Sequence, residues 1–328
     1  MKRLVIIICS VVLLLGVTVP AVAFGIINAD KVIVRKNYKE VDFADDVYLL
    51  MQEPKNWRDL DLSDAGFNEY DVSMIDGSTA TIPVTAELFR QLGDRYGDLY
   101  SNYPDHSKTS EAYEKLLSGE RNVVLAVAPS EEIKALAQRG NMVFDIEPFA
   151  LDGFVFIVNV DNPVNSLTQQ QVRDIYSGKI TNWKEVGGND ETIEAFQRNA
   201  DSGSQSAMVE FMGDAKLIDP LEANYFTGMS GMISGVAAYD NGKASIGYTY
   251  NYYLNAMDND QVKAISIDGI APTNDNFANG TYPITTSYYV VLRDKAATGF
   301  EAQNIKKFLL SDKGQEMVAM LGYCPVKK

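Results

Sequence analysis

The sequence predicts an α/β fold, in which strands and helices alternate along the chain. Two apolar runs of strand length, NVVLAVA at 122–128 and FVFIVNV at 154–160, are separated by the helical pattern EEIKALAQRG at 131–140. The chain has 328 residues, of which 46% are hydrophobic. It is therefore long enough to bury a substantial core, as two domains or as one large two-lobed unit.

The first 28 residues have the pattern of a segment that directs export. Lys2 and Arg3 precede an uncharged run at 4–28, and Ala21-Val-Ala23 offers a small-x-small cleavage site. The uncharged run is also long enough to span a bilayer. Two interpretations remain open, a cleaved signal peptide and a retained N-terminal anchor. Both predict an extracytoplasmic protein, either secreted or held at the outer face of the cytoplasmic membrane.

Charge and composition exclude several classes of function. Acidic residues outnumber basic ones by 44 to 29, which gives a net charge of -15 and disfavours nucleic acid as a partner. His106 is the single histidine, and Cys324 is the single cysteine after residue 28. We therefore expect no intrachain disulfide, no His-rich or Cys-rich metal site and no cofactor. His106 lies in the turn-like stretch SNYPDHSK, where we expect it to be exposed.

Residues 29–71 are polar and acidic and have no sustained periodicity. We interpret them as an acidic spacer with some local structure. Two roles remain open: a stalk that lifts the following domain from an anchor, or an extra element packed on that domain. We expect the compact part of the chain to begin with DVSMI at 71–75, which has the pattern of a strand.

Three hydroxyl-rich segments each precede a helical pattern. The first, DGSTAT at 76–81, is followed by helical spacing from Ile82, with Pro83 acceptable in the first turn. The second, SKTS at 107–110, precedes EAYEKLLSG, and the third, QRNADSGSQ at 197–205, precedes SAMVEFM. The expected caps are Ser78 or Thr79, Thr109 or Ser110, and Ser202 with Gln205 as a capping box.

These three helix starts also have the chemistry of an oxyanion site. A helix N-terminus carries unpaired amides and about half a positive charge, so several starts that converge would attract an anion. Arg198 adds a planar fork that can hold two oxygens, and Gly203 lets a ligand approach the backbone. Spacing alone leaves a second interpretation open, in which the hydroxyls are ordinary caps and Arg198 forms an ion pair, for example with Asp201.

Longer stretches resemble the phosphate-binding proteins of ABC importers. The run from Asn159 to Thr168 continues into IYSGKITNW, then GG, then R-x-x-x-S-G-S. DGSTATIPV resembles the first ligand-binding loop of that family, SEAYEKLLSGERNVVLAVAPSEE resembles its second, and GQEMVAMLGYCPV resembles its closing helix. The resemblance covers about residues 72–328.

This resemblance implies a type II periplasmic-binding-protein fold, with two α/β lobes joined by hinge strands around an interlobe ligand cleft. Residues 72–157 and 252–328 would form one lobe, and residues 158–251 the other. Carried over residue by residue, the ligand-binding set would be Ser78, Thr79, Arg198, Ser202, Gly203 and Ser204, with Thr109 and Ser110 from a block that aligns more loosely.

One departure from the family concerns an aspartate. In that family an aspartate at the end of the strand after the second loop accepts a hydrogen bond from a protonated phosphate oxygen, which helps to exclude sulfate. The corresponding strand here, NVVLAVAPSEE, has no aspartate. Asp76 or Asp201 would be the replacement, although a loop-holding role is an open alternative for both.

The sequence therefore predicts a solute-binding protein that captures inorganic phosphate, or a similar oxyanion, and delivers it to an ABC permease as a monomer. A single histidine and the absence of a G-x-S-x-G elbow argue against a hydrolase, and no P-loop or dinucleotide motif is present. The alternative functions are a membrane-anchored oxyanion sensor or interaction module on the same fold, and then a phosphoester hydrolase.

Overall fold

The computed structural model places its described residues in one compact unit, 41–328. They comprise residues 50–93, 106–200, 202–220, 225–226, 229–237, 242–293 and 300–326. Among them, no helix combines the length and the apolar character that a bilayer crossing requires. The predicted export signal lies outside the described residues.

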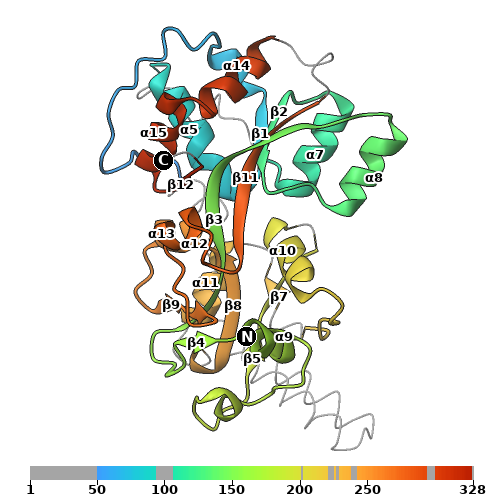
Figure 1. Cartoon of the computed structure of the whole chain (residues 1–328), viewed down its shortest axis with the longest axis vertical. Coiled ribbons are helices and arrows are strands. Elements are labelled where there is room, and N and C mark those ends of the chain that lie inside the picture. Colours follow the sequence, from blue (N-terminus) through green and yellow to red (C-terminus); the bar gives the residue numbers. More distant parts are fainter. Residues whose placement is uncertain are drawn as a thin grey trace, which may run out of the picture. The chain divides into compact units, whose positions relative to one another are not determined.

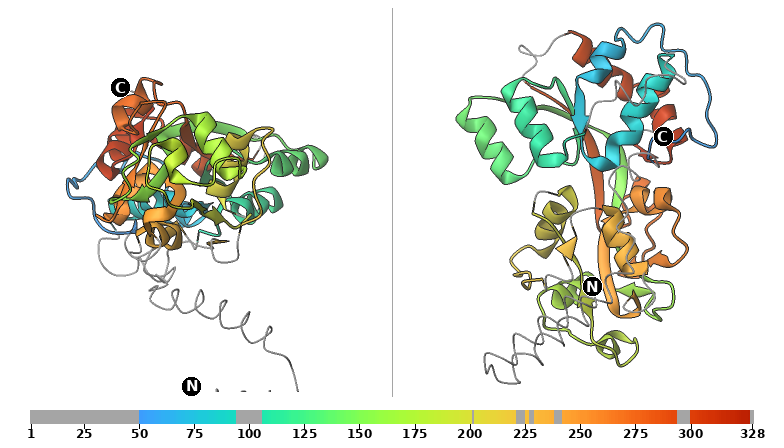
Figure 2. Two further views of the ribbon diagram at one scale, coloured as in Figure 1. Left: turned by 90° about the horizontal axis from the view of Figure 1, so that it is seen from below. Right: turned by 180° about the vertical axis from the view of Figure 1, so that it is seen from behind.

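The long strand β3 (Asp145–Asn159) organises the fold, because two groups of strands pair with its two halves. From Asp145 to Gly153 it pairs antiparallel with β11 (Thr285–Leu292), and from Phe154 to Val158 it pairs antiparallel with β8 (Ser245–Tyr250). Both pairings belong to one eight-stranded mixed sheet of the described residues, with strand order β1-β2-β11-β3-β8-β5 (Figure 1, Figure 2).

The other strands extend this sheet or form short pairs. In the sheet, β1 (Ile75–Gly77) is parallel to β2 (Val123–Ala126), and β5 (Glu194–Ala195) is parallel to β8. The strands β9 (Val262–Ala264) and β12 (Cys324–Pro325) both pair with β3. Two separate pairs are β4 (Ser166–Leu167) with β10 (Ser266–Ile267), and β6 (Gln197–Arg198) with β7 (Tyr225–Phe226).

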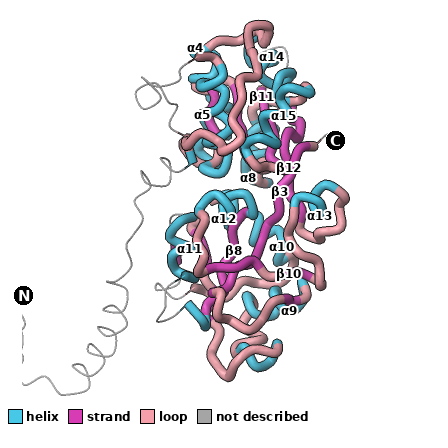
Figure 3. Tube along the Cα trace, turned by 90° about the vertical axis from the view of Figure 1, so that its left-hand side faces the viewer, coloured by secondary structure: helices cyan, strands magenta, loops and turns pink. Residues whose placement is uncertain are grey.

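Helices pack on this framework, and those on β8 can be followed in Figure 3. The α-helices are α4 (Glu69–Ser73), α5 (Ile82–Gln91), α7 (Thr109–Ser118), α8 (Glu131–Arg139), α9 (Gln169–Tyr176), α10 (Gly203–Met212), α11 (Met229–Ala237), α12 (Asn251–Met257), α13 (Asn274–Ala278), α14 (Phe300–Leu309) and α15 (Asp312–Leu321). The 3₁₀ turns are η2 (Thr79–Thr81), η3 (Trp183–Val186) and η5 (Gly242–Ala244). The predicted α/β class is confirmed.

The start of the folded region differs from the sequence-based expectation. Residues 69–73 form helix α4 instead of a strand, and β1 begins only at Ile75. The reason is local: Asn68 accepts hydrogen bonds from the first amides of α4, and Asp71 accepts from the amide of Asn68 in return. The strand predicted at 71–75 is therefore wrong except at its last residue.

Part of the predicted spacer belongs to the core. Leu50, Met51, Leu60 and Leu62 are buried in the main hydrophobic cluster. The amide of Leu60 donates to Oε1 of Gln91 on α5 at 2.8 Å. From residue 50 onward the segment is thus packed on the domain, the second of the two roles considered for it. Residues 29–49 lie outside the described residues.

The pairing of two short strands, β9 and β10, concerns the predicted boundary between the lobes. The prediction places residues 262–267 in the first lobe, yet β9 pairs with the end of β3 and β10 pairs with β4. These partners lie at 157–159 and 166–167, mostly in the predicted second lobe. The lobe boundaries stay a prediction, and this pairing favours a second crossing closer to β11.

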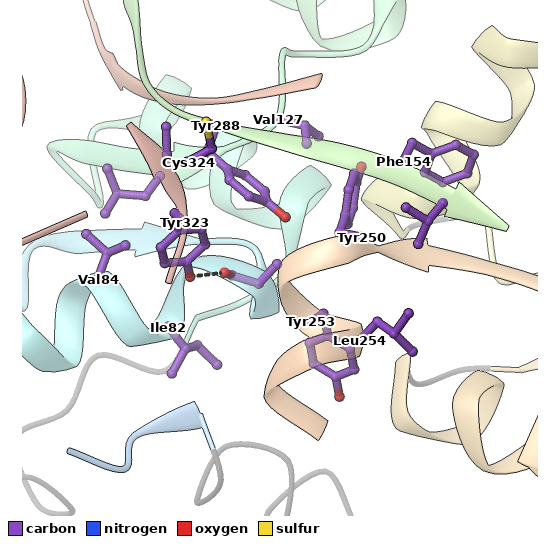
Figure 4. Close-up of a cluster of buried hydrophobic side chains, with 14 of the residues drawn as sticks. Ile82, Val84, Val127, Phe154, Tyr250, Tyr253, Leu254, Tyr288, Tyr323 and Cys324 are labelled. Carbon is purple, nitrogen blue, oxygen red and sulfur yellow. Dashed lines mark hydrogen bonds between the residues drawn. The ribbon is translucent and has the colours of Figure 1, made fainter. Parts of the chain in front are cut away.

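A cluster of tyrosines surrounds the point where β3 passes from β11 to β8 (Figure 4). Tyr323 stacks on Tyr252 with ring centroids 3.6 Å apart, and its hydroxyl donates to the carbonyl of Ala80 at 2.5 Å. Tyr250 and Tyr288 pack edge to face, 5.7 Å apart. The crossing is therefore a densely packed aromatic region connected to the first predicted binding loop.

Candidate functional site

The first predicted binding loop is held firmly by backbone contacts. Ser78 occupies the N-cap position of η2 and is 9% exposed, while Thr79 begins η2 and is half-buried. The Ser78 amide donates to the carbonyl of Leu125 on β2 at 3.0 Å. Neither residue forms a side-chain cap on η2 or α5, so the predicted capping is wrong here. Thr81 Oγ1 instead donates to the Leu125 carbonyl at 2.6 Å, which draws the loop onto the strand.

His106 is buried, and the expectation that it is exposed is wrong. Its side chain joins two loops: Nδ1 donates to the Ser78 carbonyl at 2.9 Å, and Nε2 lies 3.1 Å from Oγ1 of Thr85 on α5. The ring fits there because residue 77 is glycine, where a Cβ would lie 3.0 Å from His106 Cε1. A polar sequence stretch predicted exposure, but partners more than 20 residues away determine the burial.

Asp76 is fully buried in the middle of β1 and connects the same two loops. Its Oδ1 accepts from the amides of Gly77 and Ser107, at 2.6 and 2.8 Å, and its Oδ2 accepts from the Ser107 hydroxyl at 2.6 Å. Arg121 Nε lies 3.7 Å from Oδ2. These contacts favour the loop-holding role for Asp76. Its role as an acceptor for a protonated anion stays a prediction.

Helix α7 begins one residue earlier than a hydroxyl cap would require. Thr109 is its first residue, so Lys108 occupies the N-cap position, and no side chain of the described residues caps the helix. The predicted capping by Thr109 or Ser110 is therefore wrong. Lys108 has φ of 75°, which is uncommon for a residue with a side chain. Thr109 is buried and Ser110 is half-buried, so both hydroxyls lie at an uncapped helix start.

The start of α10 is organised around Arg198 and Ser202. Ser202 Oγ accepts from the amide of Gln205 at 3.1 Å, which confirms the predicted cap. The Gln205 carboxamide accepts from the Arg198 amide instead of returning to Ser202, so the second half of the capping box does not form. Arg198 is 5% exposed, donates from Nε to the Phe226 carbonyl at 3.2 Å and lies 3.5 Å from Ser204 Oγ through Nη1. Asp201 lies outside the described residues.

The starts of α7 and α10 meet. A Cβ built on Gly203 would lie 2.7 Å from Thr109 Oγ1 and 3.4 Å from Val127 Cγ2. The structure thus brings Thr109 against Gly203, beside Ser202, Ser204 and Arg198. The bonds of His106 and Asp76 connect the Ser78 loop to the segment that leads into Thr109.

Two tyrosines of β8 support this arrangement. Tyr248 Oη accepts from the Arg198 amide at 3.0 Å, and Tyr250 Oη donates to the Gly203 carbonyl at 3.1 Å. Alternation along the strand places both rings on one face of β8. That alternation, SIGYTY at 245–250, is the signal that would have identified them.

Another buried carboxylate lies where β3 changes partners. Asp152 Oδ1 accepts from the amides of Gly153 and Tyr252, at 2.8 and 3.0 Å, and Oδ2 accepts from the Tyr288 hydroxyl at 3.0 Å. Burial raises the pKa of Asp152 from 3.8 to about 7, against the opposing effect of these hydrogen bonds. Helix α12 has no side-chain cap from its N-cap residue Tyr250, so Asp152 takes over that role.

The chemistry of the converging helix starts suits an anion better than a metal ion. Hydroxyls, free helix amides and a guanidinium are hydrogen-bond donors that match oxyanion oxygens. Within the described ranges, no group of three or more His, Cys, Asp or Glu side chains could hold a metal ion.

A comparison with protein families assigns the chain. The family model of the PBP superfamily domain matches residues 71–313. The chain belongs to the PBP superfamily. The predicted type II periplasmic-binding-protein fold is confirmed, since solved structures of similar proteins align with this PBP chain over most of their length.

Several phosphate-binding proteins are similar to this PBP chain. The phosphate-binding protein PstS of Staphylococcus epidermidis is 27% identical over 73% of this chain and 74% of its own length. The Bacillus subtilis protein of the same name is 32% identical over 54% of this chain and 56% of its own.

Two solved structures extend the likeness. A phosphate ABC transporter substrate-binding protein from Clostridium perfringens, solved with bound phosphate, has 29% identity and a TM-score of 0.61 over 77% of this chain and 98% of its own. An ABC-type phosphate transport receptor from Vibrio cholerae has 26% identity and a TM-score of 0.59 over 76% and 98%.

Proposed function

We propose that this PBP chain is an extracytoplasmic solute-binding protein that captures inorganic phosphate, or a similar oxyanion, for an ABC importer. The observation that carries the proposal is the meeting of two helix starts, α7 without a side-chain cap and α10 beside the buried Arg198. The similarity to phosphate-binding proteins supports the same conclusion.

In this proposal the ligand is held by donors alone. The first amides of α7 and the hydroxyls of Ser78, Thr79, Thr109 and Ser110 bind from one side. Arg198, Ser202, Gly203 and Ser204 bind from the other, and Arg198 grips two oxygens. Closing the lobes around the anion removes water and brings Gly203 against Thr109. The closed form is then recognised by a membrane permease.

The remaining parts of the proposal concern location and activity. The protein is exported and acts as a monomer, either secreted or anchored by residues 1–28. It binds its ligand without turnover, since the relatives are binding proteins and not enzymes. A separate ATPase supplies the energy for transport, as no nucleotide-binding motif occurs in the sequence.

The decisive experiment removes the guanidinium. Arg198→Ala deletes a charge-assisted contact from a desolvated site, so we expect phosphate affinity, measured by titration calorimetry on ligand-free protein, to fall by about 100-fold or more. Arg139→Ala, at an exposed position at the end of α8, is the matched control and leaves the affinity unchanged. Equal affinity in the two variants would remove Arg198 from the site, and no phosphate binding by the unaltered protein would end the proposal.

A further inference from the structure

We propose that Val127 sets the specificity of this site, so that it accepts fully ionised tetrahedral anions such as sulfate together with the phosphate dianion. This inference rests on the proposed function, because it concerns the anions that the same site takes. It differs from that function in predicting weak discrimination between phosphate and sulfate.

Val127 follows directly after β2 and points at the start of α10. It is 8% exposed, and its Cγ2 lies 3.4 Å from the Cβ position of Gly203, the first residue of that helix. The Tyr113 hydroxyl donates to the Val127 carbonyl at 2.7 Å, which fixes the backbone there. Val127 and Thr109 therefore both face the start of α10, and Val127 presents methyl groups to it.

The side chain at this position determines how the site treats a proton on the ligand. A carboxylate would accept a hydrogen bond from a protonated oxygen and repel an ionised one, because it has no donor of its own. A methyl group can do neither. A protonated anion gains no partner from Val127, and a fully ionised anion meets no repulsion.

Asp76, whose bonds connect the Ser78 loop to the segment before α7, does not replace the missing acceptor. Both oxygens of Asp76 are already engaged, Oδ1 by the amides of Gly77 and Ser107 and Oδ2 by the Ser107 hydroxyl. Arg121 also lies against Oδ2. Asp76 therefore contributes to the site by fixing the loop that leads into α7. The charges at the site, Arg198 and the helix starts, then favour the more highly charged form of the ligand.

The test compares two anions over a range of pH. Titration calorimetry with sulfate and with phosphate, from pH 5.5 to 8.5 at constant ionic strength, is expected to give affinities within about tenfold of each other at pH 8. Sulfate is fully ionised throughout, so its affinity stays level or falls slightly as the pH rises. Phosphate affinity increases as the second proton is lost.

A substitution then restores discrimination. Val127→Asp places a carboxylate against the anion, so sulfate affinity should fall by about 100-fold or more while phosphate, which can keep a proton, loses much less. Val143→Asp makes the same change at a position that is 68% exposed and leaves both affinities unchanged. Val127→Asn separates polarity from charge, because it adds a polar group that is neutral and should alter the ratio of the two affinities little.

The outcomes separate this inference from the proposed function. Phosphate binding with sulfate excluded overturns the inference and leaves the function in place. If Asp201→Asn then admits sulfate, Asp201 is the acceptor and the inference is wrong for that reason. Binding of neither anion overturns the function itself. Should Val127→Asp fail to fold by circular dichroism, the affinity ratio and pH profile of the unaltered protein decide the matter alone.

Discussion

The first amides of α7 and of α12 both lack a cap from the preceding residue, and the two helices differ in what takes its place. Neither helix receives a side-chain cap from the residue at its N-cap position, Lys108 in one case and Tyr250 in the other. At α12, the carboxylate of Asp152 reaches over from β3 and accepts from the Tyr252 amide at 3.0 Å. At α7, no side chain of the described residues takes that place.

This difference distinguishes helix starts with a structural role from a helix start that is available to bind a ligand. A helix start has unpaired amides, and Asp152 permanently supplies a hydrogen-bond acceptor for them at α12. Helices elsewhere use hydroxyl caps in the same way, as Ser130 does on α8, Thr168 on α9 and Ser311 on α15. An uncapped start beside a buried arginine is instead suited to an anion that comes and goes.

Among the substitutions that test this difference between helix starts, the largest expected effect comes from filling the space where α7 and α10 meet. In Gly203→Ala, the new methyl would lie 2.7 Å from Thr109 Oγ1, closer than real Cβ contacts allow. We expect phosphate affinity to fall by about 100-fold, because a misplaced contact prevents the two helix starts from closing on the ligand. Gly140→Ala, whose methyl would have an ordinary contact of 3.5 Å, is the control. Normal affinity in Gly203→Ala would show that this contact is not part of the bound form.

The next effect concerns the carboxylate at α12. Because the pKa of Asp152 is raised from 3.8 to about 7, the folded protein binds its proton more tightly than the unfolded chain does. Its contribution to the free energy of unfolding is full below about pH 4 and is lost as the pH rises towards 7. Asp152→Asn keeps a neutral acceptor for the Gly153 and Tyr252 amides at every pH.

We therefore expect Asp152→Asn to be more stable than the unaltered protein at pH 8, by about 1–3 kcal/mol, and to match it more closely at pH 5. Urea denaturation at both pH values measures the difference. Asp260→Asn, which removes an exposed carboxylate, serves as the control. A loss of stability at pH 8 would mean that the charged form of Asp152 holds α12 in place.

The smallest effect distinguishes two serine caps. Ser202→Ala and Ser130→Ala each remove a side-chain cap, from α10 and α8, so both should lower the free energy of unfolding by about 1 kcal/mol. Only Ser202→Ala should also weaken phosphate binding, since Ser202 lies beside Gly203 and Ser204. Equal affinities in the two variants would reduce Ser202 to an ordinary cap.

Local patterns were enough to predict much of the fold. The strand pattern at 122–128 contains β2, the one at 154–160 overlaps the end of β3, and the helical pattern at 131–140 contains α8, because apolar periodicity is visible within a few residues. The helix at 69–73 is hard to predict because its signal, the reciprocal capping by Asn68 and Asp71, lies in an acidic stretch without sustained periodicity.

The candidate site was less predictable, because its geometry depends on distant partners. The burial of His106 depends on Ser78 and Thr85, which are 28 and 21 residues away. The Tyr288 hydroxyl that donates to Asp152 is 136 residues away in the sequence. No local pattern records these contacts. The resemblance to a known family predicted a ligand-binding role for the residues at the start of α10. It did not show that α7 begins at Thr109 with its first amides uncapped.

The hydrogen bond from Tyr323 to the Ala80 carbonyl has a consequence for folding kinetics. It spans 243 residues and supports the turn that carries Ser78 and Thr79, next to the pairing of β12 with β3. Contacts of such long sequence separation form late, since the loop that they close is large. During refolding, the gain of ligand affinity should therefore lag behind the gain of helical signal. Binding competence becomes a marker that the whole chain, and not only the loop, has reached its native state.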